Sequence, residues 1–413
     1  MKLDLTDLLY AMSYALDAIE EEILGIATEH GKHVAYLAFF MGMEAGFEEE
    51  ELRDFVGCCI LHDNALTEFF REELLKNPMG KEFEDKFPGK IDPDLVFNHS
   101  GHSVIGEQNI RLMPFRTNVE NVILYHHENA DGTGPLGKTA SETSLKSQIL
   151  QLADMVDVTC KLEKMTEKEF GEISKWVRSQ SGKMFSEEAA ELFEKTIDFE
   201  KIRVLQSKSV IDVLKEQMKT KVSDYSDEEI RNIAGLFARI VDYKSEYTEK
   251  HSLGVSVKAE QMADYYGFDA EKRIRFYFAG AMHDIGKLVV KNDILEKTGK
   301  LTIEEFTTIK NHASATYYIL SQMKEIPDIV EWASNHHEKL NGTGYPRGLT
   351  AESLSFEDRL MACIDIYQAL TGKRSYKDEW SHEKAISIMM DMAERGELDD
   401  KIVRDMDYVM SRT

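Results

Sequence analysis

Two short stretches of the chain place adjacent histidines before a glycine-rich turn. HHENADGTGP begins at His126, and HHEKLNGTGYP begins at His336. The imidazole nitrogen is a ligand that iron, manganese, zinc and nickel all accept. Because the glycine-rich residues that follow cannot continue a helix, each stretch places two candidate ligands directly before a loop. The second stretch contains a Tyr that the first lacks.

Two sets of five histidines repeat along the chain at matched spacing. In both sets 32 residues separate the first two members and 24 separate the third from the fourth. An Asp follows the second His, and another Asp lies beyond the His pair. The first set is His30, His62, Asp63, His102, His126, His127 and Asp154, and the second is His251, His283, Asp284, His312, His336, His337 and Asp365. Only three of the thirteen histidines lie outside these sets, which indicates a duplicated domain.

Each set predicts a site for divalent metal ions. Imidazoles and carboxylates without a thiolate suit Fe, Mn, Zn or Ni and argue against a structural zinc site. Seven groups exceed the needs of one ion and suit two metals bridged by a carboxylate, for which Asp284 is the natural choice. Two such metals lower the pKa of a shared water and stabilise in-line displacement at phosphorus, so phosphodiester hydrolysis is the expected reaction.

The elements that must position these ligands are predicted to be helical. Gly and Pro are sparse, and apolar residues recur at three- and four-residue spacing, as in the stripe formed by Ile233, Leu236, Phe237 and Ile240. The fold class is therefore all-α, with two tandem helical-bundle domains. We expect one domain at 1–200, a helical connector at 201–225 and a second domain at 226–413. The run beginning at Ser226 has the composition of a helix start.

The charge and composition of the chain disfavour several classes of function. A formal charge of −25 disfavours binding to DNA or RNA polymers, although a metal cluster can supply local positive charge for a small anionic substrate. No apolar run approaches the roughly 18 residues that cross a bilayer, and the first residues do not resemble a signal peptide. A cytoplasmic protein without a membrane segment is expected. The four cysteines lack metal-site spacing and are predicted to be buried free thiols.

Several motifs of the second half, taken together, are specific for one known protein family. MHDIGK at 282–287, IKNH ending at 312, HHEKLNGTGYP and DIYQALTGKRSYK at 365–377 resemble the HD-GYP domain, a branch of the HD superfamily of metal-dependent phosphohydrolases. The resemblance covers 230–413. It implies an α-helical bundle with two or three metal ions, commonly iron or manganese. It also implies hydrolysis of cyclic di-GMP to pGpG or GMP by a hydroxide that bridges the metals.

The resemblance assigns roles to individual residues. All seven members of the second set become metal ligands, and Asp284 is also catalytic. Lys287 would neutralise the scissile phosphate or protonate the leaving oxygen. The residues expected to face the substrate are Gly344, Tyr345, Pro346, Arg374 and Lys377.

The chain departs from the family pattern at three positions of the second copy. Gln368 stands where a second Asp is usual, and Gly254 replaces a frequent Arg, which affects substrate recognition. Tyr247 stands where members with a third metal carry an acid, so two metals are expected unless Glu246 compensates.

The first copy keeps the whole ligand pattern and loses other groups. Leu66 occupies the position of Lys287, and GTGP replaces GTGYP. One hypothesis makes this copy a metal-bound regulatory or auxiliary domain. The other makes it a phosphohydrolase with a different substrate.

Alternatives to cyclic di-GMP hydrolysis remain at this stage. The substrate could be cyclic GMP-AMP or another phosphate ester. The chain could instead be a receptor that binds cyclic di-GMP without hydrolysing it. Oxygen-dependent di-iron chemistry is disfavoured by Lys287 and the GYP loop. The two domains could form a pseudo-dimer within one chain, or the chain could form a homodimer.

Overall fold

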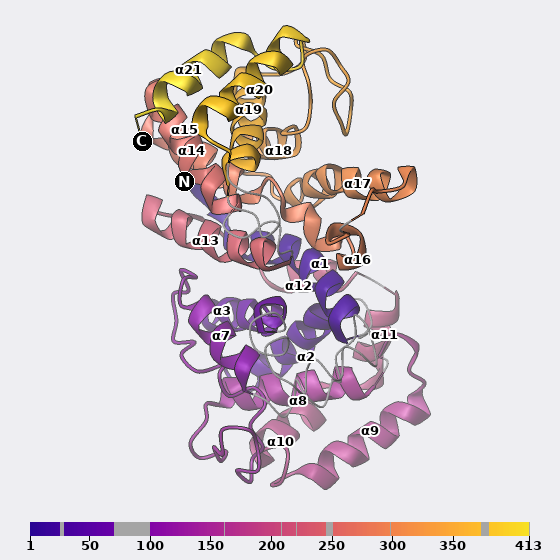
Figure 1. The fold of residues 1–413 in the computed structure, drawn as a ribbon. Helices are drawn as coiled ribbons and strands as arrows, with labels where there is room; N and C mark the ends of the chain where they lie inside the picture. The colour runs from indigo at the N-terminus through magenta and orange to yellow at the C-terminus, as the bar shows by residue number, and fades with distance from the viewer. Residues whose placement is uncertain are drawn as a thin grey trace. The chain divides into compact units, whose positions relative to one another are not determined.

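The computed structural model describes residues 1–24, 29–69, 100–160, 162–207, 209–219, 221–244, 251–297, 299–372 and 380–412. These residues are predominantly helical, with one small sheet of two three-residue strands, which confirms the all-α prediction (Figure 1). The chain divides into two compact units. One is Leu5–Lys221, and the other is Val222–Thr413 together with Met1–Asp4.

The first unit, Leu5–Lys221, contains the first histidine set. Its described elements are α1 (Leu5–Leu24), α2 (His30–Glu44), α3 (Glu49–Ile60), α4 (Leu66–Phe69), α7 (Gly101–Ile110), α8 (Leu145–Thr159), the 3-10 helix η2 (Leu162–Lys164), α9 (Glu167–Gln180), α10 (Glu187–Thr196), α11 (Phe199–Ser207) and α12 (Val210–Gln217). Helix α2 packs against α3 and α8. Helices α11 and α12 belong to this unit, where the sequence suggested a connector.

The second unit contains the second histidine set. Its described elements are β1 (Lys2–Asp4), β2 (Val222–Asp224), α13 (Asp227–Lys244), α14 (His251–Tyr265), α15 (Ala270–Met282), the 3-10 helix η4 (Ile285–Val289), α16 (Asn292–Leu295), α17 (Ile303–Leu320), α18 (Pro327–Ser334), α19 (Phe356–Thr371), α20 (His382–Glu394) and α21 (Asp400–Met410). Helix α14 packs against α13, α15 and α19. The apolar stripe predicted on α13 is fully buried.

Local side-chain contacts explain where the site helices begin. The Thr302 hydroxyl accepts the Glu305 backbone N–H, and the Glu305 carboxylate accepts the Thr302 N–H, which forms a capping box at the start of α17. Ser355 and Asp358 form the same arrangement at α19. The predicted helix start after Ser226 is confirmed, because α13 begins at Asp227.

The small sheet attaches the N-terminal residues to the second unit. Strand β1 pairs antiparallel with β2, so that Lys2 lies opposite Asp224. The N-terminal ammonium donates to the Tyr225 carbonyl at 2.7 Å. The four cysteines are free and buried, as predicted. Among the described helices, none is both long and apolar enough to span a bilayer.

Candidate metal centres and active site

The second ligand set comes from five segments of the second unit. His251 begins α14, and the His283-Asp284 pair follows α15 at the start of η4. His312 lies within α17, His336 and His337 follow α18, and Asp365 lies within α19. The structure brings all seven candidate ligands together, and most are buried.

Asp284 lies at the centre of this cluster. Its Oδ2 lies 3.2 Å from Nε2 of His283 and 2.5 Å from Nζ of Lys287. Its Oδ1 lies 3.4 Å from Nε2 of His312 and 3.8 Å from Nε2 of His336. The two oxygens therefore face different histidines, which is the arrangement that a carboxylate bridging two metal ions requires.

Asp365 lies near His283 and two further histidines, His251 and His337. Its Oδ1 lies 3.1 Å from Nε2 of His251 and 3.7 Å from Nε2 of His283. Its Oδ2 lies 3.6 Å from Nδ1 of His337. Nitrogen and oxygen ligands of one metal at about 2.0–2.2 Å from the ion must lie within a few ångströms of each other, so these spacings fit a metal centre.

Backbone carbonyls fix the tautomers of three of these histidines. Nδ1 of His283 donates to the Gly280 carbonyl at 2.7 Å, and His312 and His336 donate to the carbonyls of Ile309 and Ala333. Because a carbonyl can only accept, each Nδ1 carries a proton, which leaves Nε2 as the nitrogen that can offer a lone pair to a metal. Nε2 of His312 and Nε2 of His336 nevertheless face each other at 3.3 Å. A cation between them would satisfy both, so the residues fit a bound metal.

The pKa shifts of His336, His337 and Asp284 suit metal binding. Burial lowers the pKa of His337 to about 3 and places that of His336 well below its usual value, so both imidazoles are neutral. Burial opposes ionisation of Asp284, but His283 and Lys287 outweigh it, and the pKa of Asp284 lies well below its ordinary value. Neutral histidines and an ionised aspartate are the forms that bind a metal.

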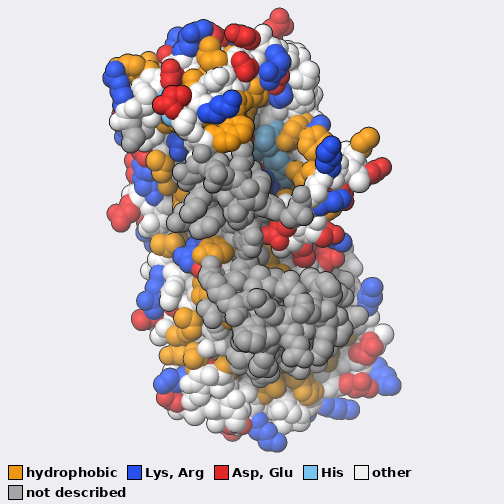
Figure 2. Space-filling view, viewed as in Figure 1, with side chains coloured by type: hydrophobic (Ala, Val, Ile, Leu, Met, Phe, Trp, Pro, Cys, Tyr) orange, Lys and Arg blue, Asp and Glu red, His pale blue; other side chains and the backbone are white. Residues whose placement is uncertain are grey.

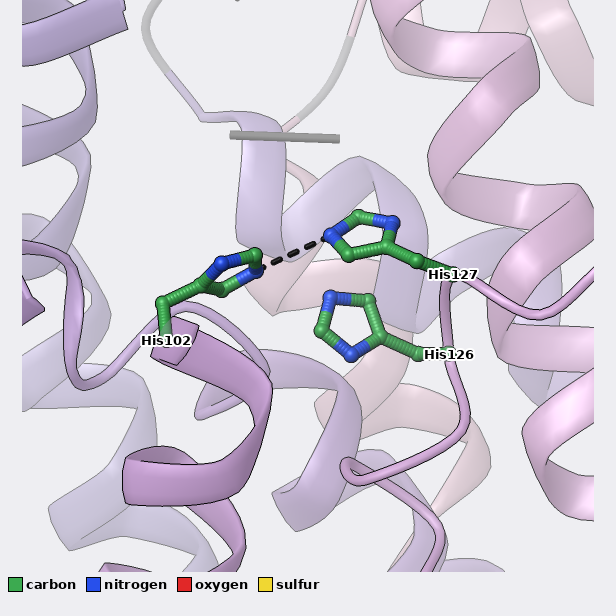
Figure 3. Close-up of side chains that lie close together, drawn as sticks. All are labelled: His102, His126 and His127. Atoms are coloured by element: carbon green, nitrogen blue, oxygen red, sulfur yellow. Dashed lines mark hydrogen bonds between the residues drawn. The ribbon is translucent and has the colours of Figure 1, made fainter. Parts of the chain in front are cut away.

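The first set forms a comparable cluster in the first unit. Nε2 of His102 lies 2.9 Å from Nε2 of His127, with His126 beside them (Figure 3). Nε2 of His102 also lies 3.5 Å from Oδ1 of Asp63. Nδ1 of His126 donates to the Ile123 carbonyl, which leaves Nε2 as the unprotonated nitrogen. This Nε2 has no hydrogen-bond partner in the described part of the chain. A second metal centre is therefore compatible with these residues.

The remaining three ligands of the first set, His30, His62 and Asp154, lie close to each other. Nε2 of His30 lies 3.3 Å from Oδ1 of Asp154, and His62 lies 3.9 Å from the same oxygen. The lysine is missing here, since the equivalent Leu66 is an apolar side chain buried in the core. Burial then raises the pKa of Asp63 to about 6, in contrast to Asp284.

Access to solvent also differs between the clusters. The His337 side chain is 26% exposed, whereas that of the equivalent His127 is 5% exposed. Figure 2 shows a recessed pale-blue patch of His surface near α18 of the second unit. The second cluster is therefore reachable by a substrate from this side.

The GYP loop lies against the second cluster. The Tyr345 ring lies 4.7 Å from the His337 ring, centroid to centroid, and its backbone N–H donates to the His337 carbonyl. At Gly344 a Cβ would come within 2.4 Å of the Lys339 nitrogen, so only glycine fits. Pro346 follows in the same loop. Arg374 and Lys377, predicted to face the substrate, lie outside the described residues, as do Tyr247 and Glu246.

Two residues near this loop were missed by sequence reasoning. Nζ of Lys310 lies 4.7 Å from the Phe306 ring centroid and 5.2 Å from that of Tyr345, which places a cation beside the cluster. The buried Glu338 carboxylate accepts the backbone N–H groups of Arg347 and Leu349 and thereby fixes the loop. Glu338 could have been found from the sequence, because both copies read HHE. Lys310 could not, because a single Lys on a helix has no distinctive pattern.

Comparisons with known proteins agree with this description. Two family models, each described as HD domain, match residues 28–159 and 235–402. The chain is 28% identical to the 3′3′-cGAMP-specific phosphodiesterase 1 of Vibrio cholerae over 95% of its own length and 89% of that protein's. It is 31% identical to a cyclic di-GMP phosphodiesterase response regulator of Xanthomonas campestris, over 45% of this chain and 49% of the relative.

A solved structure shares the fold. The crystal structure of a cyclic GMP-AMP-specific phosphodiesterase of Vibrio cholerae superposes with a TM-score of 0.64, at 21% identity, over 100% of this chain and 99% of that one. Fold, cluster and family models together define an HD-type phosphohydrolase. The chain belongs to the HD domain family, with two HD domains in tandem, the second of HD-GYP type and the first a variant. HD phosphohydrolases depend on metal ions.

Proposed function

We propose that the second copy hydrolyses a 3′3′-linked cyclic dinucleotide at a two-metal centre formed by its seven candidate ligands. The observation that carries this proposal is the position of Asp284 between two groups of histidines, with Lys287 at 2.5 Å from its Oδ2. Bound divalent ions, with Mn or Fe expected and Zn or Ni as alternatives, would supply Lewis acidity and an activated water nucleophile.

The protein side chains would bind and position the phosphodiester. Lys287 places its ammonium beside the cluster, where it can neutralise a phosphate oxygen or protonate the leaving oxygen. The Tyr345 ring and Lys310 form one wall, suited to a purine base and a phosphate. Arg374 and Lys377 would extend the same phosphate-binding surface. The net charge of −25 makes these local cations important for capturing an anionic substrate.

The preferred substrate within this proposal is 3′3′-cyclic GMP-AMP. Supporting it, the relative that matches along nearly the whole chain, through both copies, carries that specificity in its name. Cyclic di-GMP, hydrolysed to pGpG or GMP, is the second candidate, supported by a relative that matches less than half of the chain. A receptor that binds without hydrolysis is a third outcome, disfavoured by the presence of Lys287.

The test is a comparison of kcat/KM for the two dinucleotides, using manganese-loaded full-length protein and mass spectrometry of the products. The expected result is linear products from both substrates and at least a tenfold preference for cyclic GMP-AMP. A reversed preference would make cyclic di-GMP the substrate. Bound nucleotide without product would support the receptor.

We also propose that the protein acts in the cytoplasm, because buried free cysteines suit that reducing compartment.

The first copy is proposed to be an auxiliary metal-binding domain. Its cluster keeps the ligands but is more closed, and Leu66 replaces the lysine. Hydrolysis of a cyclic dinucleotide by a variant that lacks the second-copy ligands would contradict this assignment.

A further inference from the structure

The two copies differ at a pair of positions behind the metal ligands. Three residues after the first ligand histidine, the first copy has His33 and the second has Gly254. Three residues after the last ligand aspartate, the first copy has Asp157 and the second has Gln368. In the first copy the two side chains contact each other, and in the second the Gln368 amide lies where a side chain on residue 254 would be. The two positions therefore act as a unit.

In the first copy Asp157 binds the far side of a candidate ligand. Its Oδ2 lies 2.7 Å from Nδ1 of His30, and its Oδ1 lies 2.9 Å from Nδ1 of His33. All three side chains are buried. Nδ1 of His30 is thereby held as the donor, and its Nε2 points toward Asp154 at 3.3 Å. A carboxylate on the distal nitrogen orients a ligating imidazole and raises its basicity, and losing such a carboxylate typically lowers metal affinity by about 10–100-fold.

The described residues of the second copy show a different arrangement at these positions. A Cβ on residue 254 would come within 2.2 Å of Nε2 of Gln368, so the amide fills the space that a longer side chain would need. Oε1 of Gln368 accepts from Nζ of Lys258 at 2.6 Å. Within the described parts of the chain, the carboxylates found within 4.0 Å of the His251 ring nitrogens are Asp284 and Asp365, which are themselves candidate ligands.

The solvent exposure of the ligands also differs between the copies, and it too favours tighter retention of metal by the first copy. The seven candidate ligands of the first copy are all buried, whereas His337 of the second is partly exposed. The groups that could draw an anion to the second cluster, Lys287 and Lys310, correspond to Leu66 and Ser100 in the first. A closed cluster with an oriented ligand loses its ion slowly, because water and competing ligands must first reach the metal.

We propose that the first copy is a retained metal site, which holds its divalent ions at least tenfold more persistently than the second and so stays loaded while the catalytic ions exchange. The proposal rests on both copies binding metal, which is part of the proposed function, but not on hydrolysis. Its role would be to keep the first unit folded independently of metal supply, since a bound ion stabilises the state that binds it.

The test follows metal release from manganese-loaded full-length protein in excess EDTA. Two phases of similar amplitude are expected, the slower at least tenfold slower. The double change His283→Ala with Asp284→Ala should remove the fast phase alone. Asp157→Asn should accelerate the slow phase by about 10–100-fold. The matched change Gln368→Asn should leave the slow phase as it is.

Several results would overturn the inference. They are a single phase, loss of the slow phase in the second-copy variant, or a slow phase that Asp157→Asn does not change. Circular dichroism reports whether Asp157→Asn folds. If it does not, His33→Gly with Asp157→Gln, which reproduces the second copy's pair, takes its place. Two phases without hydrolysis would contradict the proposed hydrolysis alone. Metal in the second copy alone would contradict this inference and the metal-binding role of the first copy, but not the proposed hydrolysis.

Discussion

The ammonium of Lys287 lies 2.5 Å from Oδ2 of Asp284, which is the carboxylate that faces histidines on both sides of the second cluster. This ion pair distinguishes the two copies, because the apolar Leu66 occupies the position of the lysine in the first copy. The pKa of Asp63 rises to about 6 through burial, while that of Asp284 stays well below its ordinary value despite burial. Lys287, second in effect to His283, thus helps to keep the pKa of Asp284 low, and it adds a cation that the first copy does not have at this position.

The first prediction concerns this lysine. Lys287→Leu, which reproduces the first copy, should lower kcat for the cyclic dinucleotide by about 10²–10³-fold, since a positioned acid or cation is lost. Metal content measured by elemental analysis should stay unchanged. Lys291→Leu, an exposed lysine of the same segment, is the control and should keep its rate. A Lys287→Leu enzyme within twofold of wild type would show that the lysine is dispensable.

The second prediction concerns Lys310. Lys310→Ser removes a cation that lies near two aromatic rings at the mouth of the cluster, and should lower kcat/KM about tenfold, mainly through KM. Steady-state kinetics provide the measurement. Lys324→Ser, at an exposed position before α18, should have no effect. A change in kcat without a change in KM would place Lys310 outside substrate binding.

The third prediction concerns the acid that holds each glycine-rich loop. Glu338→Ala leaves the backbone N–H groups of Arg347, Gly348 and Leu349 without their acceptor. It should cost about 1–3 kcal/mol of unfolding free energy and abolish most activity, because the loop carries Tyr345. Urea unfolding and initial rates measure the two effects.

The matched change in the first copy separates stability from catalysis. Glu128 accepts the N–H groups of Leu136 and Lys138 in the equivalent loop. Glu128→Ala should lower the stability of the first unit by a similar amount and leave kcat within twofold. Equal loss of activity from both variants would mean that the loop in the first copy also serves the reaction.

The fourth prediction concerns pH and a buried acid on α1. Burial, assisted by the negative charges of Asp17 and Asp63, raises the pKa of Glu20 to about 8 against the opposing effects of His30 and Lys32. Below about pH 4.5 the folded and unfolded states both carry this proton. Between that pH and about 8 the unfolded state releases it and the folded state keeps it, so stability falls as pH rises.

Glu20→Gln removes this titration. In metal-free protein the variant should match wild type near pH 4.5 and should be more stable than wild type at pH 8, by a few kcal/mol. Urea unfolding of the first unit at pH 5, 6, 7 and 8 gives the comparison. Parallel profiles for the two proteins would contradict a neutral Glu20 in the folded state.

Much of the fold and cluster could be predicted because both depend on short-range patterns. Most ligand histidines lie at or next to a helix start or end, although His312 lies within α17, and their spacing is the same in both copies. The glycines after His336 predict the turn there. The GTGYP loop could be located without coordinates for the same reason. Its glycine at 344 is required by a close backbone approach that a Cβ would block.

Other features depend on contacts between residues far apart in the chain. Strand β1 has three residues, too few to show alternation, and its partner lies more than 200 residues away. His33 was one of the three histidines outside the repeat, yet it shares Asp157 with the ligand His30. In the sequence, Lys310 resembles an ordinary solvent-exposed charge on a helix. Only the structure shows that it lies beside the Tyr345 ring.

The central claim is that the second copy hydrolyses a cyclic dinucleotide at the cluster around Asp284. Manganese-loaded Asp284→Ala and Asp63→Ala variants, incubated with 3′3′-cyclic GMP-AMP and cyclic di-GMP and followed by mass spectrometry, test it directly. We predict that Asp284→Ala yields no linear product and that Asp63→Ala retains most of the wild-type rate. Full activity of Asp284→Ala, or its loss in Asp63→Ala with both units folded, would contradict the claim.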